Sequence, residues 1–276
     1  MIARGFHPTA LLCGFGTAAT AAGMLRCTAD QLSSAWAILQ PMANGSMQFS
    51  EDPERTMVKR LHAGLNAHNG ILAAQLASYG FDGPRGALDG RFGMLTLLNP
   101  DSRPHLLLER RDSLYEIHSV SLKPYPCCRL FHSAIDALRE VTGGFTLAPE
   151  RIREVRVSGP ANLVFQHMST RPRSVMAAQY SLPFSLSTSL IHGPESYAAY
   201  EAAAWEDERV LNIADRISAS IDDRLEASFP AHFGACIVLL LDDGTQREAR
   251  VLNSRGTIES PLTWEDIVRK GEELSR

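Results

Sequence analysis

The stretch KPYPCCRLFHSAID, residues 123–136, concentrates residue types that bind anions and carry protons. Because Pro124 and Pro126 restrict the backbone on both sides of a tyrosine, Arg129 arrives at the N-terminus of the helix that follows. Free N–H groups and the helix dipole favour an anion there. Arg129 can bind a carboxylate through two parallel hydrogen bonds, and Lys123 can supply a point charge or a proton. We therefore expect this stretch to contribute to a carboxylate site.

Two adjacent cysteines in the same stretch leave two other chemistries to consider. A metal site is disfavoured, because Cys127 and Cys128 lack the usual C-x-x-C spacing and no matching cysteine or histidine pair follows. A nucleophilic thiol stays an alternative, since a helix N-terminus lowers the pKa of a thiol, but no spacing identifies its base. The five cysteines of the chain show no disulfide framework, which favours a reducing, cytoplasmic location.

Histidine and lysine stand at the start of two further predicted helices. In RGFHPT, His7 precedes a proline, which favours an extended backbone that lifts the side chain off the helix start. In MVKRLHAG, Lys59 and His62 lie three residues apart at the front of an apolar helix. These residue types transfer protons, but each is also typical of an ordinary loop or a solvated helix flank. A fourth stretch, AAQYSLPFSLSTSLIHG, is predicted as one helix carrying Tyr180 and His192, and its composition indicates packing.

The composition excludes several classes of function. The 27 basic and 31 acidic residues give a net charge of −4, and the basic ones are scattered, so nucleic acid is a poor partner. The sequence has no glycine-rich phosphate loop, no nucleophile elbow and no zinc motif. No segment has the roughly 18 uninterrupted apolar residues of a membrane span. An Ala- and Gly-rich run near the N-terminus imitates a secretory signal, but Thr17 and Thr20 interrupt it and favour a packed helix.

The first third of the chain is predicted to be helical. Helices are expected at residues 10–26 and from Thr28, where Gln31 completes a capping box. The next helix ends at Gly80. Its apolar stripe is formed by Leu61, Leu65, His68, Leu72, Leu76 and Tyr79. A short helix is expected from Pro84.

Later residues are predicted to mix helices and strands. Strands are expected at residues 115–123 and 152–159, with a helix at 129–141 between them. A helix is expected at 206–225, and residues 232–251 show a β-hairpin signal at their Asp-Gly turn.

A final helix, capped by Thr263, closes the chain. The order of elements favours an α+β fold with two domains. A mainly helical domain, discontinuous in sequence, is expected to contain residues 1–118 and 246–276. An inserted α+β domain is expected to contain residues 119–245.

Five blocks, taken in order, resemble the MmgE/PrpD family. The blocks are GFHPT, MVKRLHAG, DGRFGML, KPYPCCRLFHSAID and AQYSLPFSLSTSLIHG. That family includes 2-methylcitrate dehydratase, cis-aconitate decarboxylase and an iminodisuccinate epimerase. The resemblance spans the chain from Arg4 to the final helix. It implies a helical domain with an inserted α+β lid, no metal or organic cofactor, and a homodimer.

The resemblance also implies roles for single residues. His7 matches the active-site histidine of the family's central block, Lys59 the lysine of its K-x-L-H block, and Lys123 the lysine that starts the lid. The residues expected to contact substrate are His62, Cys128 and Arg129. Decarboxylase-like members have a histidine five residues after the lid lysine, where this chain has Cys128. The resemblance therefore disfavours decarboxylation and favours a dehydratase or an isomerase.

Two functions remain open from the sequence. The first is a cofactor-independent lyase or isomerase, similar to 2-methylcitrate dehydratase, that removes a proton alpha to a carboxylate of a small di- or tricarboxylate. The second is non-catalytic. Family members are longer, and their N-terminal helices carry further active-site residues, including an aspartate and a histidine, without counterpart here. Removing helices from a bundle exposes apolar faces, so a truncated remnant would associate with itself or with a partner.

Overall fold

The chain folds into two compact units, each with its own buried residues. The computed structural model describes residues 4–52, 56–99, 101–109, 115–165, 168–201 and 204–275. Among these, the first unit ends at residue 109 and the second begins at residue 115.

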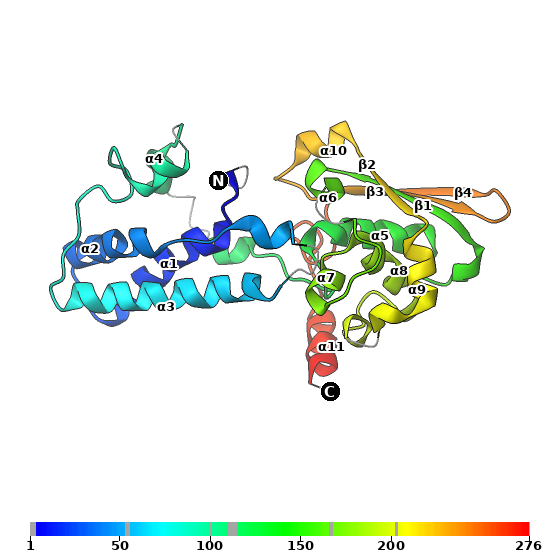
Figure 1. Ribbon diagram of the computed structural model, residues 1–276, viewed down its shortest axis with the longest axis horizontal. Helices are drawn as coiled ribbons and strands as arrows, with labels where there is room; N and C mark the ends of the chain where they lie inside the picture. Colours follow the sequence, from blue (N-terminus) through cyan, green and yellow to red (C-terminus); the bar gives the residue numbers. More distant parts are fainter. Residues whose placement is uncertain are drawn as a thin grey trace. The chain divides into compact units, whose positions relative to one another are not determined.

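Three helices form the body of the first unit. They are α1 (Pro8–Met24), α2 (Ala29–Leu39) and α3 (Val58–Ser78), and each packs against the other two (Figure 1). The capping box predicted at the start of α2 is confirmed, because the side chain of Thr28 accepts a hydrogen bond from Gln31 N. The shorter elements are η2 (Gln40–Met42), η3 (Met47–Ser50), α4 (Met94–Leu98) and η4 (Pro104–Leu107).

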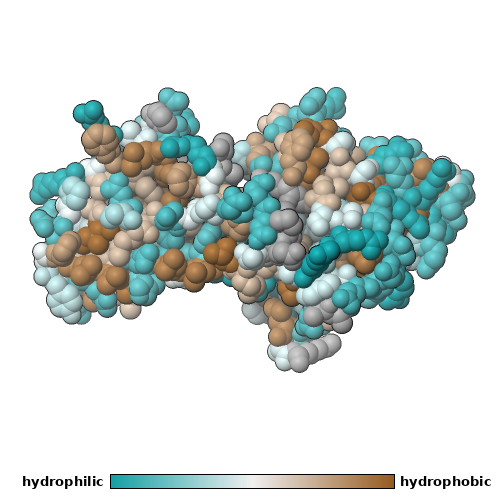
Figure 2. Space-filling model, viewed as in Figure 1, coloured by the Kyte–Doolittle hydropathy of each residue, from teal (hydrophilic) through white to brown (hydrophobic). Residues whose placement is uncertain are grey.

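The face of α3 that is buried differs from the predicted stripe. The buried residues are His62, Asn66, Gly70, Ala73, Ala74 and Ala77. Small side chains let the helix backbones approach closely: a Cβ at Gly70 would lie 2.5 Å from the carbonyl oxygen of Gly14 on α1. Leu61 is 56% exposed and Leu65 is 45% exposed, whereas Leu72 and Leu76 are half-buried. Figure 2 shows apolar side chains along α3. The predicted helix is present, but its buried face is the side of small residues and not the apolar stripe.

The short helix predicted from Pro84 is also wrong. Residues 85–90 form turns. Gly86 adopts a left-handed φ of +80°, which interrupts a right-handed helix, and Gly90 N–H donates back to Gly86 O at 2.8 Å.

A four-stranded sheet with the order β2-β1-β3-β4 forms the centre of the second unit. Strand β1 (Ile152–Gly159) runs parallel to β2 (Ile217–Ile221) and antiparallel to β3 (Ala235–Leu241). Strands β3 and β4 (Gln246–Val251) form the predicted hairpin. Helix α5 (His132–Val141) packs against β3 and β4 (Figure 1), so the strand, hairpin and helix predicted here are confirmed.

Other helices complete the second unit around a large apolar core. They are η5 (Glu116–Ser119), η6 (Arg129–Phe131), η7 (Pro149–Arg151), α6 (Ala161–Phe165), α7 (Val175–Gln179), α8 (Leu182–His192), η8 (Ala198–Tyr200), η9 (Ala204–Glu206), α9 (Glu208–Ala214), α10 (Asp223–Ser228) and α11 (Trp264–Leu274). The cap predicted at Thr263 for the last helix is present, and Asp266 completes a capping box there. Across the described ranges of both units, no helix combines the length and apolar character that a membrane span requires.

The strand predicted at residues 115–123 is wrong. This segment contains the 3-10 helix η5 and lies outside the sheet. Ile117 and Val120 are exposed, so their alternation with polar residues does not mark a buried face.

Two predicted long helices are each divided in the structure. The helix predicted at 206–225 is interrupted by β2, because Ile217 is buried where this segment pairs with β1. The helix predicted over AAQYSLPFSLSTSLIHG is two helices, α7 and α8. Ser181 stands between them with an extended backbone and accepts a hydrogen bond from Phe184 N, which starts α8.

The fold is mixed α and β, but the discontinuous helical domain and its lid are not confirmed. Residues 246–276 group with the second unit, because β4 pairs with β3 along its length. The boundary predicted between residues 245 and 246 therefore separates two strands that the structure joins.

Candidate functional site

His7 is held at the start of α1 by the pairing of two short segments. Its backbone N–H donates to Gly45 O at 3.0 Å, and Phe6 forms an antiparallel bridge with Ser46. A Cβ at Gly45 would lie 2.0 Å from the Cβ of Ala10, so a larger residue would push this segment off α1. His7 is the extended N-cap residue of α1 and makes no side-chain cap, as expected for the position before a proline. Its imidazole is therefore available for other contacts.

The imidazole of His7 contacts that of His62, which α3 supplies. The two Nδ1 atoms are 2.9 Å apart, and the ring centroids are 5.1 Å apart. At this distance one Nδ1 carries a hydrogen and donates a hydrogen bond, and the other Nδ1 accepts that bond. Phe49 packs edge-on against both rings, with centroid distances of 5.3 and 5.6 Å. The aromatic contact limits how far either imidazole can turn.

Lys59 gives this pair a cationic neighbour. Its Nζ lies 5.2 Å from the ring centroid of Phe49. Burial, then the charges of Lys59 and His62, lower the pKa of His7 to about 4. Burial and Lys59 also lower the pKa of His62. Both imidazoles are therefore neutral at pH 7 beside a positive charge. We call His7, Phe49, Lys59 and His62 the histidine cluster.

The second group of predicted residues lies on residues 122–129, called here the lysine loop, which is tied to the C-terminal region. Leu122 N–H donates to Gly256 O at 2.8 Å, and Lys270 Nζ donates to Lys123 O at 2.7 Å. Lys123 Nζ donates across the loop to a main-chain carbonyl at 3.2 Å. Burial and then the nearby Lys123 lower the pKa of Lys270. The main chain at the start of the loop is thus held to the C-terminal region.

A buried carboxylate strengthens this connection. Asp136 on α5 accepts a hydrogen bond from Tyr125 OH, and its second oxygen accepts from Arg255 N at 2.7 Å. Burial, followed by Asp136, raises the pKa of Tyr125, so the phenol remains a donor. Arg255 pairs in turn with Glu195 at 3.2 Å and Asp266 at 2.9 Å. The lysine loop, α5 and α11 therefore share one polar network.

Arg129 is turned inward in this structure. Its Nη1 donates to the carbonyl oxygens of Leu122 at 3.4 Å and Arg255 at 3.3 Å, and to Nδ1 of His132 at 3.1 Å. Its Nη2 is buried and has no hydrogen-bond partner within the described residues. Burial, then Arg129, lower the pKa of His132 to about 2, which keeps that imidazole a neutral acceptor. The carboxylate-binding role predicted for Arg129 stays a prediction.

The two adjacent cysteines differ in their surroundings. Cys127 is buried, and burial raises the pKa of its thiol to about 12, so it is not a thiolate at neutral pH. Cys128 is half-buried, precedes η6, and its backbone N–H donates to Gln179 O at 2.8 Å. The thiol mechanism is therefore disfavoured for Cys127, and substrate contact by Cys128 stays a prediction.

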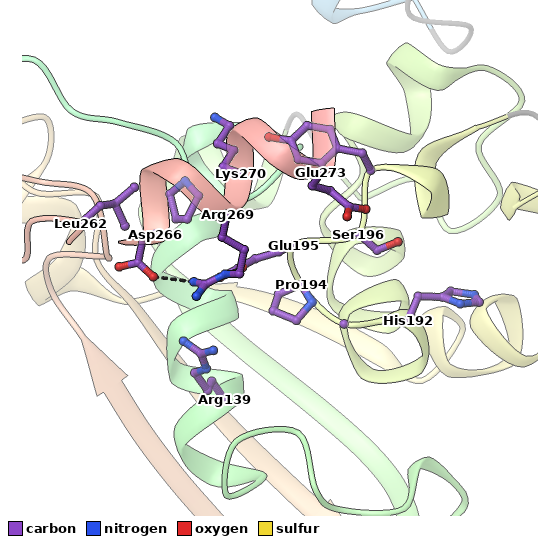
Figure 3. Close-up of a pocket in the computed structure, with 13 residues that line it drawn as sticks. Arg139, His192, Pro194, Glu195, Ser196, Leu262, Asp266, Arg269, Lys270 and Glu273 are labelled. Carbon is purple, nitrogen blue, oxygen red and sulfur yellow. Dashed lines mark hydrogen bonds and ion pairs between the residues drawn. The ribbon is translucent and has the colours of Figure 1, made fainter. Parts of the chain in front are cut away.

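A cavity of about 410 Å³ lies in the second unit, between α11 and the turn after α8 (Figure 3). Its lining residues are Pro124, Arg139, His192, Gly193, Pro194, Glu195, Ser196, Tyr197, Leu262, Asp266, Arg269, Lys270 and Glu273. Arg269 pairs with both Glu195 and Asp266, so these carboxylates are already neutralised. The cavity contains none of the six predicted site residues.

The structure thus brings the six predicted site residues together in two groups. His7, Lys59 and His62 form one cluster in the first unit, while Lys123, Cys128 and Arg129 share a loop in the second. Within the part of the chain that the structure describes, no three His, Cys, Asp or Glu side chains gather as metal ligands would.

Several supporting residues were missed from the sequence. His132 and Asp136 lie one turn apart on an amphipathic helix, and this spacing is a usable signal for a pair on one face. Arg255 lies 126 residues from Arg129, and Lys270 lies 147 residues from Lys123, so no local spacing relates them. Phe49 carries no signal of its own beyond being apolar.

Family models match both halves of the chain. Residues 1–107 match the MmgE/PrpD N-terminal domain, and residues 125–276 match the MmgE/PrpD C-terminal domain. This chain belongs to the MmgE/PrpD family. The resemblance inferred from the five sequence blocks is therefore confirmed.

Curated relatives of this MmgE/PrpD chain carry the names of decarboxylases. It is 24% identical over 295 residues to the cis-aconitate decarboxylase-like protein oryM of Aspergillus oryzae. It is 24% identical over 297 residues to a cis-aconitate decarboxylase of Aspergillus terreus. Each alignment covers 100% of this chain and 59% of the relative, so the chain spans little more than half the length of these proteins.

Proposed function

We propose that this chain takes part in proton transfer next to a carboxylate of a small di- or tricarboxylic acid. The contact of His7 with His62 at 2.9 Å, beside the cationic Lys59, carries this proposal. A proton alpha to a carboxylate is weakly acidic, so its removal needs a neutral base and a positive charge near the anion that forms. The histidine cluster offers both.

His7 is the proposed base, and Lys59 is the proposed electrostatic partner. With a pKa of about 4, His7 is unprotonated at pH 7 and can accept the proton. Lys59 would attract the substrate carboxylate and stabilise the negative charge that develops on it. In a dehydration, Lys59 would then protonate the leaving hydroxyl. This assignment needs no organic cofactor.

The proposed reaction is dehydration of a 2-methylcitrate-like hydroxy acid. The support is Cys128, which replaces the histidine of decarboxylase-like members. A second candidate, decarboxylation of cis-aconitate, is favoured by the names of the curated relatives. Elimination, epimerisation and decarboxylation pass through similar anions, so one histidine cluster suits all of them.

Product analysis distinguishes these reactions. The purified chain is incubated with 2-methylcitrate, citrate and cis-aconitate, and the products are followed by NMR. An unsaturated tricarboxylate formed from 2-methylcitrate supports the dehydratase. Release of carbon dioxide from cis-aconitate would contradict the dehydratase proposal and support decarboxylation instead.

A non-catalytic role is the alternative from another class. It is favoured by the exposed leucines of α3. Analytical ultracentrifugation tests the proposed homodimer at the same time. A folded, self-associated chain without turnover of any of these acids would favour the non-catalytic role.

A further inference from the structure

The contact between His7 and His62 admits two proton arrangements, and they are not equivalent for a base. If His62 Nδ1 donates the hydrogen bond, the proton of His7 lies on its Nε2, which then has no lone pair to offer. If His7 Nδ1 donates instead, Nε2 of His7 holds the lone pair. Within the described ranges, His7 forms no side-chain hydrogen bond other than this one.

Proton uptake by His7 selects the second arrangement. A protonated His7 carries hydrogens on both ring nitrogens, so the nitrogen 2.9 Å away on His62 must be unprotonated to accept one of them. An enzyme that already has this arrangement needs no tautomer change when the substrate's C–H bond breaks. The bond's electron pair stays on the substrate, and the proton forms the new N–H bond at Nε2 of His7.

The surroundings of His62 suit a fixed acceptor better than a substrate contact. The residue is 8% exposed, and Phe49 packs edge-on against its ring at 5.6 Å. Asn66 Nδ2 donates to the main-chain carbonyl of His62 at 3.1 Å, one turn along α3. As whole residues, His7 is half-buried and His62 is buried.

We propose that His62 is a positioning residue whose Nδ1 accepts the Nδ1–H of His7 and so keeps the lone pair of His7 on Nε2. This inference rests on the proposed role of His7 as base. It assigns His62 an indirect role in place of the substrate contact expected from the family resemblance.

Histidine tautomers in the full-length chain test this proposal without any substrate. Two-bond 15N–1H correlation spectra at pH 7 to 8 are expected to show His7 protonated on Nδ1 and His62 protonated on Nε2. The opposite tautomer at His7 would overturn the proposal, even if the protein is active.

Variants then test the catalytic consequence. H62N keeps an acceptor oxygen near the position of Nδ1, whereas H62L removes it. We expect H62L to lower kcat by about 10-fold or more with little change in KM, by analogy with the loss of a hydrogen-bond partner that orients a metal-ligating histidine. H62N should recover most of that loss and keep the Nδ1–H signal of His7. H68L, the same substitution at an exposed position of α3, is the matched control and should retain kcat.

The two ideas fail in distinguishable ways. The expected tautomers without turnover of any acid would contradict the base role and leave the hydrogen-bond assignment standing. Equal kcat for H62L and H62N, with both variants folded by circular dichroism, would contradict positioning by His62 while leaving His7 as the base.

Discussion

At the scale of single residues, the histidine cluster lowers the pKa of His7, the proposed base. Burial comes first among the causes for His7, and the charge of Lys59 follows. A substrate carboxylate would offset that charge, so the proton affinity of His7 should rise when an anion binds. The cluster therefore keeps the base unprotonated in the empty site.

The first prediction concerns Lys59. Replacing it in K59Q removes a positive charge near His7, so the pKa of His7 should rise above about 4. An NMR titration of the His7 imidazole measures this shift. R60Q, on the neighbouring residue of the same helix, serves as the charge-matched comparison. Equal His7 pKa values in K59Q and the unchanged chain would contradict the electrostatic role of Lys59.

The second prediction concerns stability and pH. The folded-state pKa of His7, about 4, lies below the ordinary value of 6.5, so the folded chain binds fewer protons than the unfolded chain between these values. The free energy of unfolding should therefore be fully retained above pH 6.5 and fall as the pH drops toward 4. His62 shifts in the same direction. H7Q should lose less stability over this window than the unchanged chain in urea titrations, and an identical pH dependence would count against the low pKa.

At the scale of elements, local sequence signals predicted where helices start better than they predicted which helix face is buried or where strands form. The capping boxes at Thr28 and Thr263 depend on neighbours three residues away, so the sequence contains all of their information. The buried face of α3 depends instead on how closely α1 can approach. Strand β2 needed β1, which lies more than 50 residues away, as a partner. Such partners cannot be read from periodicity.

Two glycines of α3 make a matched pair for testing the packing of α1 against α3. In G70A the new methyl would lie 2.5 Å from Gly14 O, so overpacking should cost about 1–3 kcal/mol. In G64A the methyl would meet nothing within 4 Å, and alanine's helix preference should stabilise by up to about 1 kcal/mol. Urea unfolding measures both. Similar effects of the two substitutions would contradict the close packing.

The lysine loop should depend on the buried carboxylate of Asp136. In D136N one oxygen becomes an amide donor, which cannot accept from both Tyr125 OH and Arg255 N. We expect a loss of about 1–3 kcal/mol in the free energy of unfolding of the second unit. E140Q makes the same chemical change at an exposed position of α5 and should be nearly neutral. Equal stability of D136N and E140Q would show that the network contributes little.

At the scale of the whole molecule, the two units differ in the size of their cores. The first unit buries small clusters such as Ala18, Leu39 and Ala73, while the second has one large cluster that includes Phe131 and Phe184. Larger apolar burial gives more stability, so we expect the first unit to unfold at lower denaturant concentration.

The positions of the tryptophans allow the unfolding of the two units to be measured separately. The W205F/W264F variant leaves Trp36 as a reporter of the first unit, and W36F leaves Trp205 and Trp264 as reporters of the second. The Trp36 transition should come first in guanidinium titrations. Coincident transitions from the two reporters would contradict unequal stability.

The candidate site also shows which of its residues can be predicted from the sequence. His7 and His62 are 55 residues apart, and no spacing rule joins them. Both residues were expected at the site, His7 as a catalytic residue and His62 as a substrate contact, because blocks that resemble the MmgE/PrpD family contain them. The structure places their Nδ1 atoms 2.9 Å apart. Phe49 and Arg255 have supporting positions that depend on the folded chain, so no local sequence pattern points to them.

The most direct test of the central claim is α-proton exchange in deuterated water, followed by NMR with 2-methylcitrate, citrate and cis-aconitate. The proposed role of His7 predicts exchange by the unchanged chain, a loss of about 100-fold or more in H7A, and full exchange in the exposed control H68A. Full exchange in H7A, or none with any of these acids from a correctly folded chain, would contradict the proposal that the histidine cluster moves the proton.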